Sequence, residues 1–207
     1  MADTKASALT NYPTPTAGGD LLYIVDTTNS ASKNITLAQS HFEVANGSTS
    51  NQTGFAADTY LTGSNILIPA GGPYVDTKYL LVFDMTKTGA GVATPIVTLR
   101  IGTAGTTSDA AICVFTFAAG TAAADTGTFQ VEAIFRTVGS STSAVLQGVT
   151  SLTSNLTTTG LSNAVKVVKT TSSGFNSTTA NSIIGVSFNG GTSFSGTNTL
   201  VRAELML

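Results

Sequence analysis

The sequence predicts an all-β fold: a jelly-roll-like β-sandwich with an extended N-terminal arm or hairpin and at most one short helix. Apolar runs of strand length, rich in β-branched and aromatic residues, recur between residues 55 and 207. Loops rich in Gly, Thr and Asn divide these runs at fairly even spacing, which is typical of sandwiches and jelly rolls. Only one short segment carries the pattern of a helix.

The N-terminal part is expected to be an extended arm followed by a small hairpin. Residues 1–19 are mostly polar and include two prolines, which disfavour helix and favour extended chain. The apolar run Asp20–Asp26 (DLLYIVD) predicts a strand, and a turn followed by Lys33–Leu37 predicts its partner. A capping-box pattern then predicts a short helix from about Leu37 to Val44.

A run of small polar residues, Ala45–Thr53 (ANGSTSNQT), is the best candidate for a domain boundary. The sequence therefore predicts an N-terminal arm segment at residues 1–45, a linker at 46–54 and a jelly-roll domain at 55–207. The last of these is long enough to form one all-β domain with its own core.

About nine strands are expected in the jelly-roll domain. They are Tyr60–Ile68, Tyr79–Met85, Pro95–Ile101, Ala111–Phe117, Phe129–Thr137, Ala144–Leu152, Val165–Thr170, Ser182–Phe188 and Leu200–Leu207. The fifth run alternates most clearly, with Gln130, Glu132 and Arg136 on its polar face and Ile134 as the exception.

The run Tyr79–Met85 is apolar on both of its faces. A strand of this kind is normally buried on both sides, so we expect a second covering surface, which a subunit interface would supply. The candidates for core or intersubunit packing are Tyr79, Leu80, Leu81, Val82 and Phe83.

The composition argues against nucleic-acid and membrane partners. Only 10% of the residues are charged, 42% are hydrophobic, and the net charge is −2. The nine basic residues are scattered and form no basic patch. No apolar run reaches the roughly 18 residues of a membrane-spanning helix, and no hydrophobic signal core is evident at the N-terminus. A surface with so few charges is better suited to contact between subunits than to a lone monomer.

The sequence predicts no catalytic, cofactor-binding or metal-binding residues. Its single cysteine, Cys113, is expected to be a small buried side chain, and one His with one Cys cannot make a zinc site within one chain. The triplet Asp125-Thr126-Gly127 matches the aspartic-protease signature, but it follows alanines rather than a hydrophobic strand, so a turn before Phe129 is expected. The acids are few and mostly end a segment, and Trp is absent, which also disfavours a glycosidase.

Two stretches resemble proteins of tailed-bacteriophage virions. The run KTGAGVATPIVTLRIGTAGTTSDAAI, followed by GTAAADTGTF and FRTVGSSTSAVLQG, resembles a domain that recurs in virion structural proteins. The run TKASALTNYPTPTAGGDLLYIVDTTNSASKNITLAQ resembles the N-terminal attachment segment of phage fibre and virion-attachment proteins. These resemblances imply a trimeric jelly-roll domain carried by an attachment segment.

The function implied is that of a non-enzymatic virion structural protein. We expect a capsid decoration or cement protein that binds the major capsid protein, or another virion protein, as a homotrimer. It would be assembled in the host cytoplasm and located in the virion. The expected attachment residues, acting through apolar burial and strand pairing, are Leu9, Tyr12, Leu21, Leu22, Tyr23 and Ile24.

Two alternatives stay open on the sequence alone. The first is a short tail or head fibre, or an adaptor, involved in host attachment, with a host surface glycan as a candidate partner. The second is a carbohydrate-binding or depolymerising module. The copy number in virions would separate the capsid and fibre roles. An assay of glycan binding or hydrolysis would test the carbohydrate-binding or depolymerising module.

Overall fold

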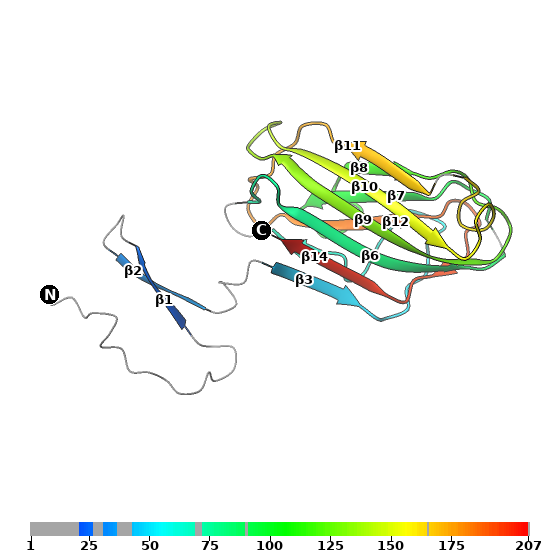
Figure 1. Ribbon diagram of the computed structural model, residues 1–207, viewed down its shortest axis with the longest axis horizontal. Coiled ribbons are helices and arrows are strands. Elements are labelled where there is room, and N and C mark those ends of the chain that lie inside the picture. The colour runs from blue at the N-terminus through cyan, green and yellow to red at the C-terminus, as the bar shows by residue number, and fades with distance from the viewer. Residues whose placement is uncertain are drawn as a thin grey trace. The chain divides into compact units, whose positions relative to one another are not determined.

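The computed structural model describes residues 21–26, 31–36, 43–68, 72–89, 91–164 and 166–206. The chain divides into two compact units, Met1–Phe42 and Glu43–Leu207. Every regular element in the described residues is a β-strand, so the predicted all-β class is confirmed. Figure 1 shows the strands of the second unit in two layers, with the longest of them in the front layer.

The strands are numbered in chain order. They are β1 (Leu21–Asp26), β2 (Ala31–Thr36), β3 (Glu43–Ser48), β4 (Thr59–Tyr60), β5 (Ile66–Leu67), β6 (Lys78–Lys87), β7 (Ile96–Gly102), β8 (Ala110–Thr116), β9 (Asp125–Thr137), β10 (Val145–Ser154), β11 (Val167–Thr171), β12 (Ile183–Asn189), β13 (Gly196–Thr197) and β14 (Val201–Met206).

The first unit contains the antiparallel pair β1 and β2, in which Leu21 lies opposite Thr36 and Asp26 opposite Ala31. The predicted hairpin is therefore present in the described backbone.

The second unit is a sandwich of two antiparallel sheets. The seven-stranded sheet has the order β11-β10-β9-β6-β14-β3, with β13 paired to β6. The five-stranded sheet has the order β4-β12-β7-β8, with β5 paired to β12. In the second unit the chain changes sheet six times: between β3 and β4, β5 and β6, β6 and β7, β8 and β9, β11 and β12, and β12 and β13. If β10, β11 and the short β5 and β13 are set aside, the orders β3-β14-β6-β9 and β4-β12-β7-β8 are those of a jelly roll.

Aromatic side chains from both sheets meet in the core. Phe83 on β6 lies opposite Phe129 on β9, and their rings stack with centroids 4.9 Å apart. Phe188 on β12 of the other sheet approaches the Phe129 ring at 5.3 Å. All three side chains are fully buried. The alternation of apolar residues along β6, β9 and β12 thus supplies the two inner faces that the sandwich buries.

Strand β3 corrects the predicted domain boundary. The linker expected at residues 46–54 begins inside this strand, which pairs with β14 along its whole length. The short helix expected from about Leu37 to Val44 lies largely outside the described residues, and Glu43 and Val44 belong to β3 instead.

Candidate interaction surface

The described charged side chains of the sandwich fall into two groups. One group makes internal hydrogen bonds that hold loops and turns. These residues are Asp58, Asp84, Lys87, Arg100, Asp109, Asp125 and Lys166. The other group lies on or beside the outer face of the seven-stranded sheet. These residues are Asp76, Lys78, Glu132, Arg136, Lys169, Arg202 and Glu204.

Lys87, at the end of β6, is a buried cation with only 2% of its surface exposed. Its Nζ donates to the backbone carbonyls of Thr88, Thr121 and Ala123, at 3.3, 2.7 and 3.0 Å. Burial lowers the pKa of Lys87, and the negative charge of Asp125 partly opposes that shift. The ammonium group therefore holds the loop between β8 and β9 against the end of β6.

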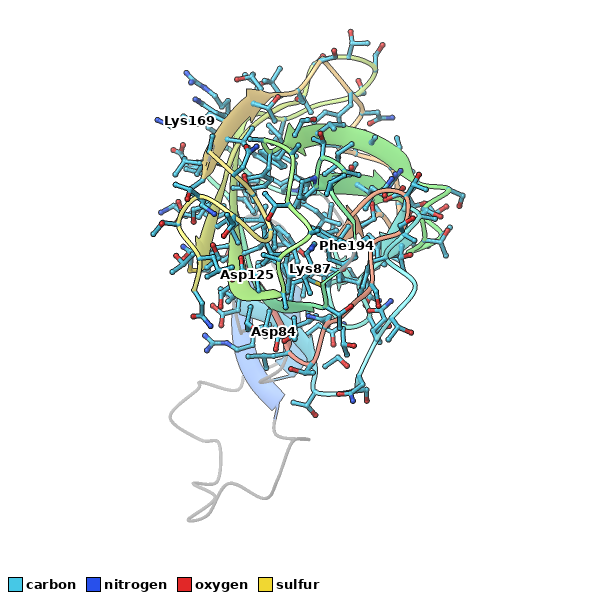
Figure 2. All side chains as sticks on the ribbon, turned by 90° about the vertical axis from the view of Figure 1, so that its right-hand side faces the viewer. Asp84, Lys87, Asp125, Lys169 and Phe194 are labelled. Atoms are coloured by element: carbon cyan, nitrogen blue, oxygen red, sulfur yellow. The ribbon has the colours of Figure 1, made fainter. Side chains whose placement is uncertain are left out.

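Asp125, the first residue of β9, has the complementary role. Its carboxylate accepts hydrogen bonds from the backbone N–H groups of Thr126, Leu156 and Leu161, at 2.9, 3.2 and 3.0 Å. Two of these donors belong to the loop between β10 and β11. Figure 2 shows Asp125 beside Lys87 at this end of the sandwich. The carboxylate of the Asp-Thr-Gly triplet is thus used to fix a loop, and the expected turn is replaced by the start of a strand.

Arg100, on β7, holds the five-stranded sheet in a similar way. Its guanidinium forms an ion pair with Asp58 at 2.5 Å, and its Nε donates to the Ser187 hydroxyl at 2.9 Å. Its Nη1 also donates to the backbone carbonyl of Asp109. These contacts tie β7 to β12 and to the turn before β8, and they leave Arg100 little freedom to bind a partner.

The outer face of the seven-stranded sheet, with its charged group, is called the charged face below. Its centre carries apolar side chains that alternate with buried ones along the strands. They are Leu80 and Val82 on β6, Ile134 on β9 and Val149 on β10, all of them half-buried. Glu132 lies between Leu80 on β6 and Val149 on β10 in the register of the sheet. Charged and apolar side chains are therefore interleaved across the central strands.

A groove of about 540 Å³ crosses the charged face over β9, β10 and β11. It is lined by Asp76, Glu132, Ile134, Arg136, Gln147, Gly148, Val149 and Lys169. The Arg136 guanidinium donates to Oε1 of Gln147 at 2.6 Å, which fixes two of the polar side chains in the wall. The groove thus offers both signs of charge around an apolar floor.

An exposed turn borders this groove. Tyr74 is 71% exposed and Val75 is 52% exposed, and both directly precede the groove residue Asp76. Asp76 has a positive φ of 69°, and its backbone N–H donates to the carbonyl of Phe135 at 2.8 Å. The turn is therefore anchored to β9 while it presents an aromatic ring and an apolar side chain to solvent.

A smaller pocket of about 100 Å³ lies on the same face. It is lined by Leu80, Val82, Gln130, Arg202 and Glu204. Its floor is the central strand β6, and its walls come from β9 and β14. Both hollows therefore lie on the charged face.

The structure divides the residues predicted for core or trimer packing. Tyr79, Leu81 and Phe83 are completely buried between the sheets. Leu80 and Val82 point the other way and form the floor of the smaller pocket. The second apolar face of this run is therefore only half covered by its own chain.

The predicted attachment residues lie in the first unit. Leu21, Leu22, Tyr23 and Ile24 belong to β1, where Leu22 pairs with Ile35 in the backbone register. Leu9 and Tyr12, like His41, lie outside the described residues.

Sequence reasoning did not identify the groove. The sequence pattern does indicate the part of the groove on β9, because Gln130, Glu132 and Arg136 mark the polar face of that strand and Ile134 breaks the alternation. No local pattern connects that face to Lys169, which only the pairing of β11 with β10 brings alongside.

Other kinds of site find little support in the described residues. No cluster there contains three or more metal-binding His, Cys, Asp or Glu side chains. Cys113 is 1% exposed, and burial raises the pKa of its thiol to about 11, so the reactive thiolate is disfavoured. In the same described part of the chain, no helix is long and apolar enough to span a bilayer.

The charged face is thus the candidate functional surface on geometric grounds. No protein-family model matches the chain, and no curated protein matches it.

Proposed function

We propose that this protein is a non-enzymatic structural component of a tailed-phage virion, acting as a homotrimeric capsid decoration or cement protein. The observation that carries the proposal is the separation of charge on the sandwich. Seven of the described charged side chains hold loops and turns through internal hydrogen bonds, and the other seven lie on or beside one contoured sheet face. The resemblance of the sequence to virion domains supplies the class of partner.

The charged face has the chemistry of a protein interface. Leu80, Val82 and Ile134 form an apolar centre, and side chains such as Arg136 and Arg202 surround it. Stable interfaces combine a desolvated apolar core with a polar rim, and both tyrosine and arginine are enriched in them. We assign contact between copies of the chain, or with the major capsid protein, to this face.

The first unit supports a separate attachment role. A two-stranded hairpin is marginally stable on its own in water, so pairing with a partner protein would stabilise β1 and β2. The apolar sequence of β1, Leu21–Asp26, suits strand addition to a sheet of a virion protein, where main-chain hydrogen bonds would provide affinity. Leu9 and Tyr12 are proposed to extend the same contact.

A short fibre or adaptor is the second candidate. The division into a hairpin unit and a sandwich unit favours it, because one unit could bind the particle while the other is displayed. In that role the groove beside Tyr74 would accept a host surface glycan, since an exposed aromatic ring and paired polar groups suit a sugar.

The copy number of the chain in purified virions tests the proposal. Quantitative mass spectrometry should give a ratio to the major capsid protein that matches the repeating capsid lattice. A ratio that fits only the tail or the vertices would favour the fibre role. Absence of the chain from the particle would refute both.

Variants of the charged face test the site itself. The double change Leu80→Lys and Val82→Lys should prevent trimer formation or particle binding while the fold is retained. Val92→Lys is the matched control, because Val92 is 61% exposed and lies outside both hollows of the charged face. Equal assembly of the two variants would contradict the assignment.

A further inference from the structure

Strand β8 is a sheet edge that carries neither a charge nor a proline. It is the last strand of the five-stranded sheet, and its sequence, AAICVFT, contains no charged residue and no proline. Val114 on this strand is 46% exposed. Natural proteins usually protect such edges with lysine, proline, a bulge, a covering segment or a very short strand, because an open edge templates pairing with another chain. Strand β8 has a bulge near its start, where the register with β7 shifts between Leu99 and Arg100, and is regular from Cys113 to Thr116.

The other sheet edges are blunted. Strand β11 carries Lys169 in its middle, and β4 and β5 are two residues long. At β3 the backbone of a turn packs over the edge, so closely that a Cβ on Gly63 would lie 2.5 Å from the carbonyl carbon of Gly47. Asn46 on β3 also donates to the Asn65 carbonyl. Strand β8 therefore differs from the other described edges in being long and uncharged, and its protective feature is the bulge near its start.

The register identifies which backbone groups of β8 are free. The N–H of Phe117 donates to the carbonyl of Pro95 at 3.0 Å, and Phe115 and Cys113 follow as partners of Val97 and Leu99. Because hydrogen-bonded pairs alternate along an antiparallel ladder, the N–H and C=O groups of Val114 and Thr116 point away from β7. No hydrogen bond to them is found within the described chain.

We propose that β8 pairs antiparallel with β8 of a second copy of this chain, about a twofold axis close to Val114. In an antiparallel pair about a twofold axis, the residue on the axis faces its own symmetry mate, and every other residue faces the one equally far on the opposite side. A charge at the centre would therefore face a like charge at a cost in stability. Strand β8 has no charge to repel its mate, whereas the same pairing of β11 would bring two Lys169 side chains together. The pair of β-branched Val114 side chains suits a sheet surface.

This contact is separate from the charged face and from the proposed trimer. Strand pairing over a few residues buries little surface, so the contact is weak in isolation. On a particle that displays many copies, several weak contacts act together and their effective affinity rises. Edge pairing would thus join neighbouring assemblies, while the charged face would hold each assembly together.

A cysteine introduced at Val114 tests the geometry directly. In a hydrogen-bonded antiparallel pair the two Cα atoms are about 5.5 Å apart, which is within the range of a disulfide. The full-length Val114→Cys variant should form covalent dimers under mild oxidation. The full-length Val167→Cys variant is the control, because Val167 is 53% exposed on the β11 edge, and it should remain largely monomeric on a non-reducing gel. Equal cross-linking of both variants, or of neither, would overturn the proposal.

A proline at the same position tests the backbone pairing. Val114→Pro removes an N–H that points to solvent and leaves the ladder with β7 intact, so circular dichroism should still show a folded sandwich. In light scattering over a concentration series, the mass of the wild type should rise toward twice that of Val114→Pro, whereas Val114→Thr should associate as the wild type does. An unchanged mass for a folded Val114→Pro variant would refute edge pairing, whatever the Leu80 and Val82 variants show. Loss of the trimer in the Leu80 and Val82 variants alone would bear on the charged face and the proposed function, and would leave edge pairing of β8 to be decided by Val114→Pro.

Discussion

Lys87 and Asp125 lie directly opposite each other on β6 and β9, yet each binds the backbone of loops rather than its partner. Lys87 donates to carbonyls of the loop between β8 and β9, and Asp125 accepts N–H groups from the loop between β10 and β11. One cross-strand pair thus fixes two loops at the same end of the sandwich (Figure 2). The opposite charges of the two groups also moderate the cost of burying each.

Asp125→Ala should destabilise the sandwich by about 3 kcal/mol, because it leaves buried N–H donors without an acceptor and removes the countercharge of Lys87. Chemical denaturation measures the change in unfolding free energy. Glu132→Ala is the matched control on the same strand, since Glu132 is exposed, and it should change stability by no more than about 0.5 kcal/mol. Equal effects would show that the loops do not depend on the Asp125 carboxylate.

Removal of the hydroxyl group should affect the stability of the fold differently at Tyr60 and at Tyr79. The Tyr79 hydroxyl donates to the Ser64 carbonyl at 2.5 Å, whereas the buried Tyr60 hydroxyl lies near the Ser64 side chain without a hydrogen bond of good geometry in the described chain. Tyr79→Phe should therefore cost about 1 to 2 kcal/mol in thermal or chemical unfolding. Tyr60→Phe should be neutral or slightly stabilising, and a large loss there would indicate a partner for its hydroxyl.

Stability should fall at alkaline pH because several buried groups resist ionisation. Burial raises the pKa of Cys113 to about 11. It is also the largest cause of the rise in the pKa of Tyr60 to about 12. A raised pKa gives stability that is complete below the unfolded pKa and is lost as pH rises through the folded one. For Cys113 this window runs from about 9 to about 11.

The contribution of Cys113 can be isolated by comparison with Cys113→Ala. The substitution creates a cavity and lowers the unfolding free energy at every pH. Only the wild type should lose, in addition, on the order of 2 kcal/mol of unfolding free energy between neutral pH and pH 11. The difference in unfolding free energy between the two proteins should therefore shrink as pH rises. A constant difference would show that the thiol does not remain protonated in the folded state.

The fold class could be predicted because it depends on periodicity. Residues such as Phe129 and Phe135 alternate with polar neighbours along β9, and that pattern alone places them on an inner face. The pairing of β14 between β6 and β3 could not be predicted, because it joins segments far apart in the chain and no local rule selects the partner.

The domain boundary was predicted wrongly for a physical reason. Asn46-Gly47 has the sequence of a turn, but a Cβ at Gly47 would lie 2.8 Å from the carbonyl oxygen of Val201. The glycine is therefore needed where two strands approach closely, and it does not mark a flexible linker. For the candidate site, Leu80 and Val82 were identified from their strand, whereas Asp76 and Lys169 depend on tertiary pairing that the sequence does not reveal.

Truncation should distinguish the predicted boundary from the observed one. A chain of residues 43–207 retains β3, which pairs with β14 from Val201 to Met206, and should unfold cooperatively at a temperature close to that of the full chain. A chain of residues 55–207 lacks β3, so it exposes the edge of β14 and should melt several degrees lower. Circular dichroism melts of both chains provide the measurement. Equal melting temperatures would mean that β3 contributes nothing to the sandwich and would restore residues 46–54 as a linker.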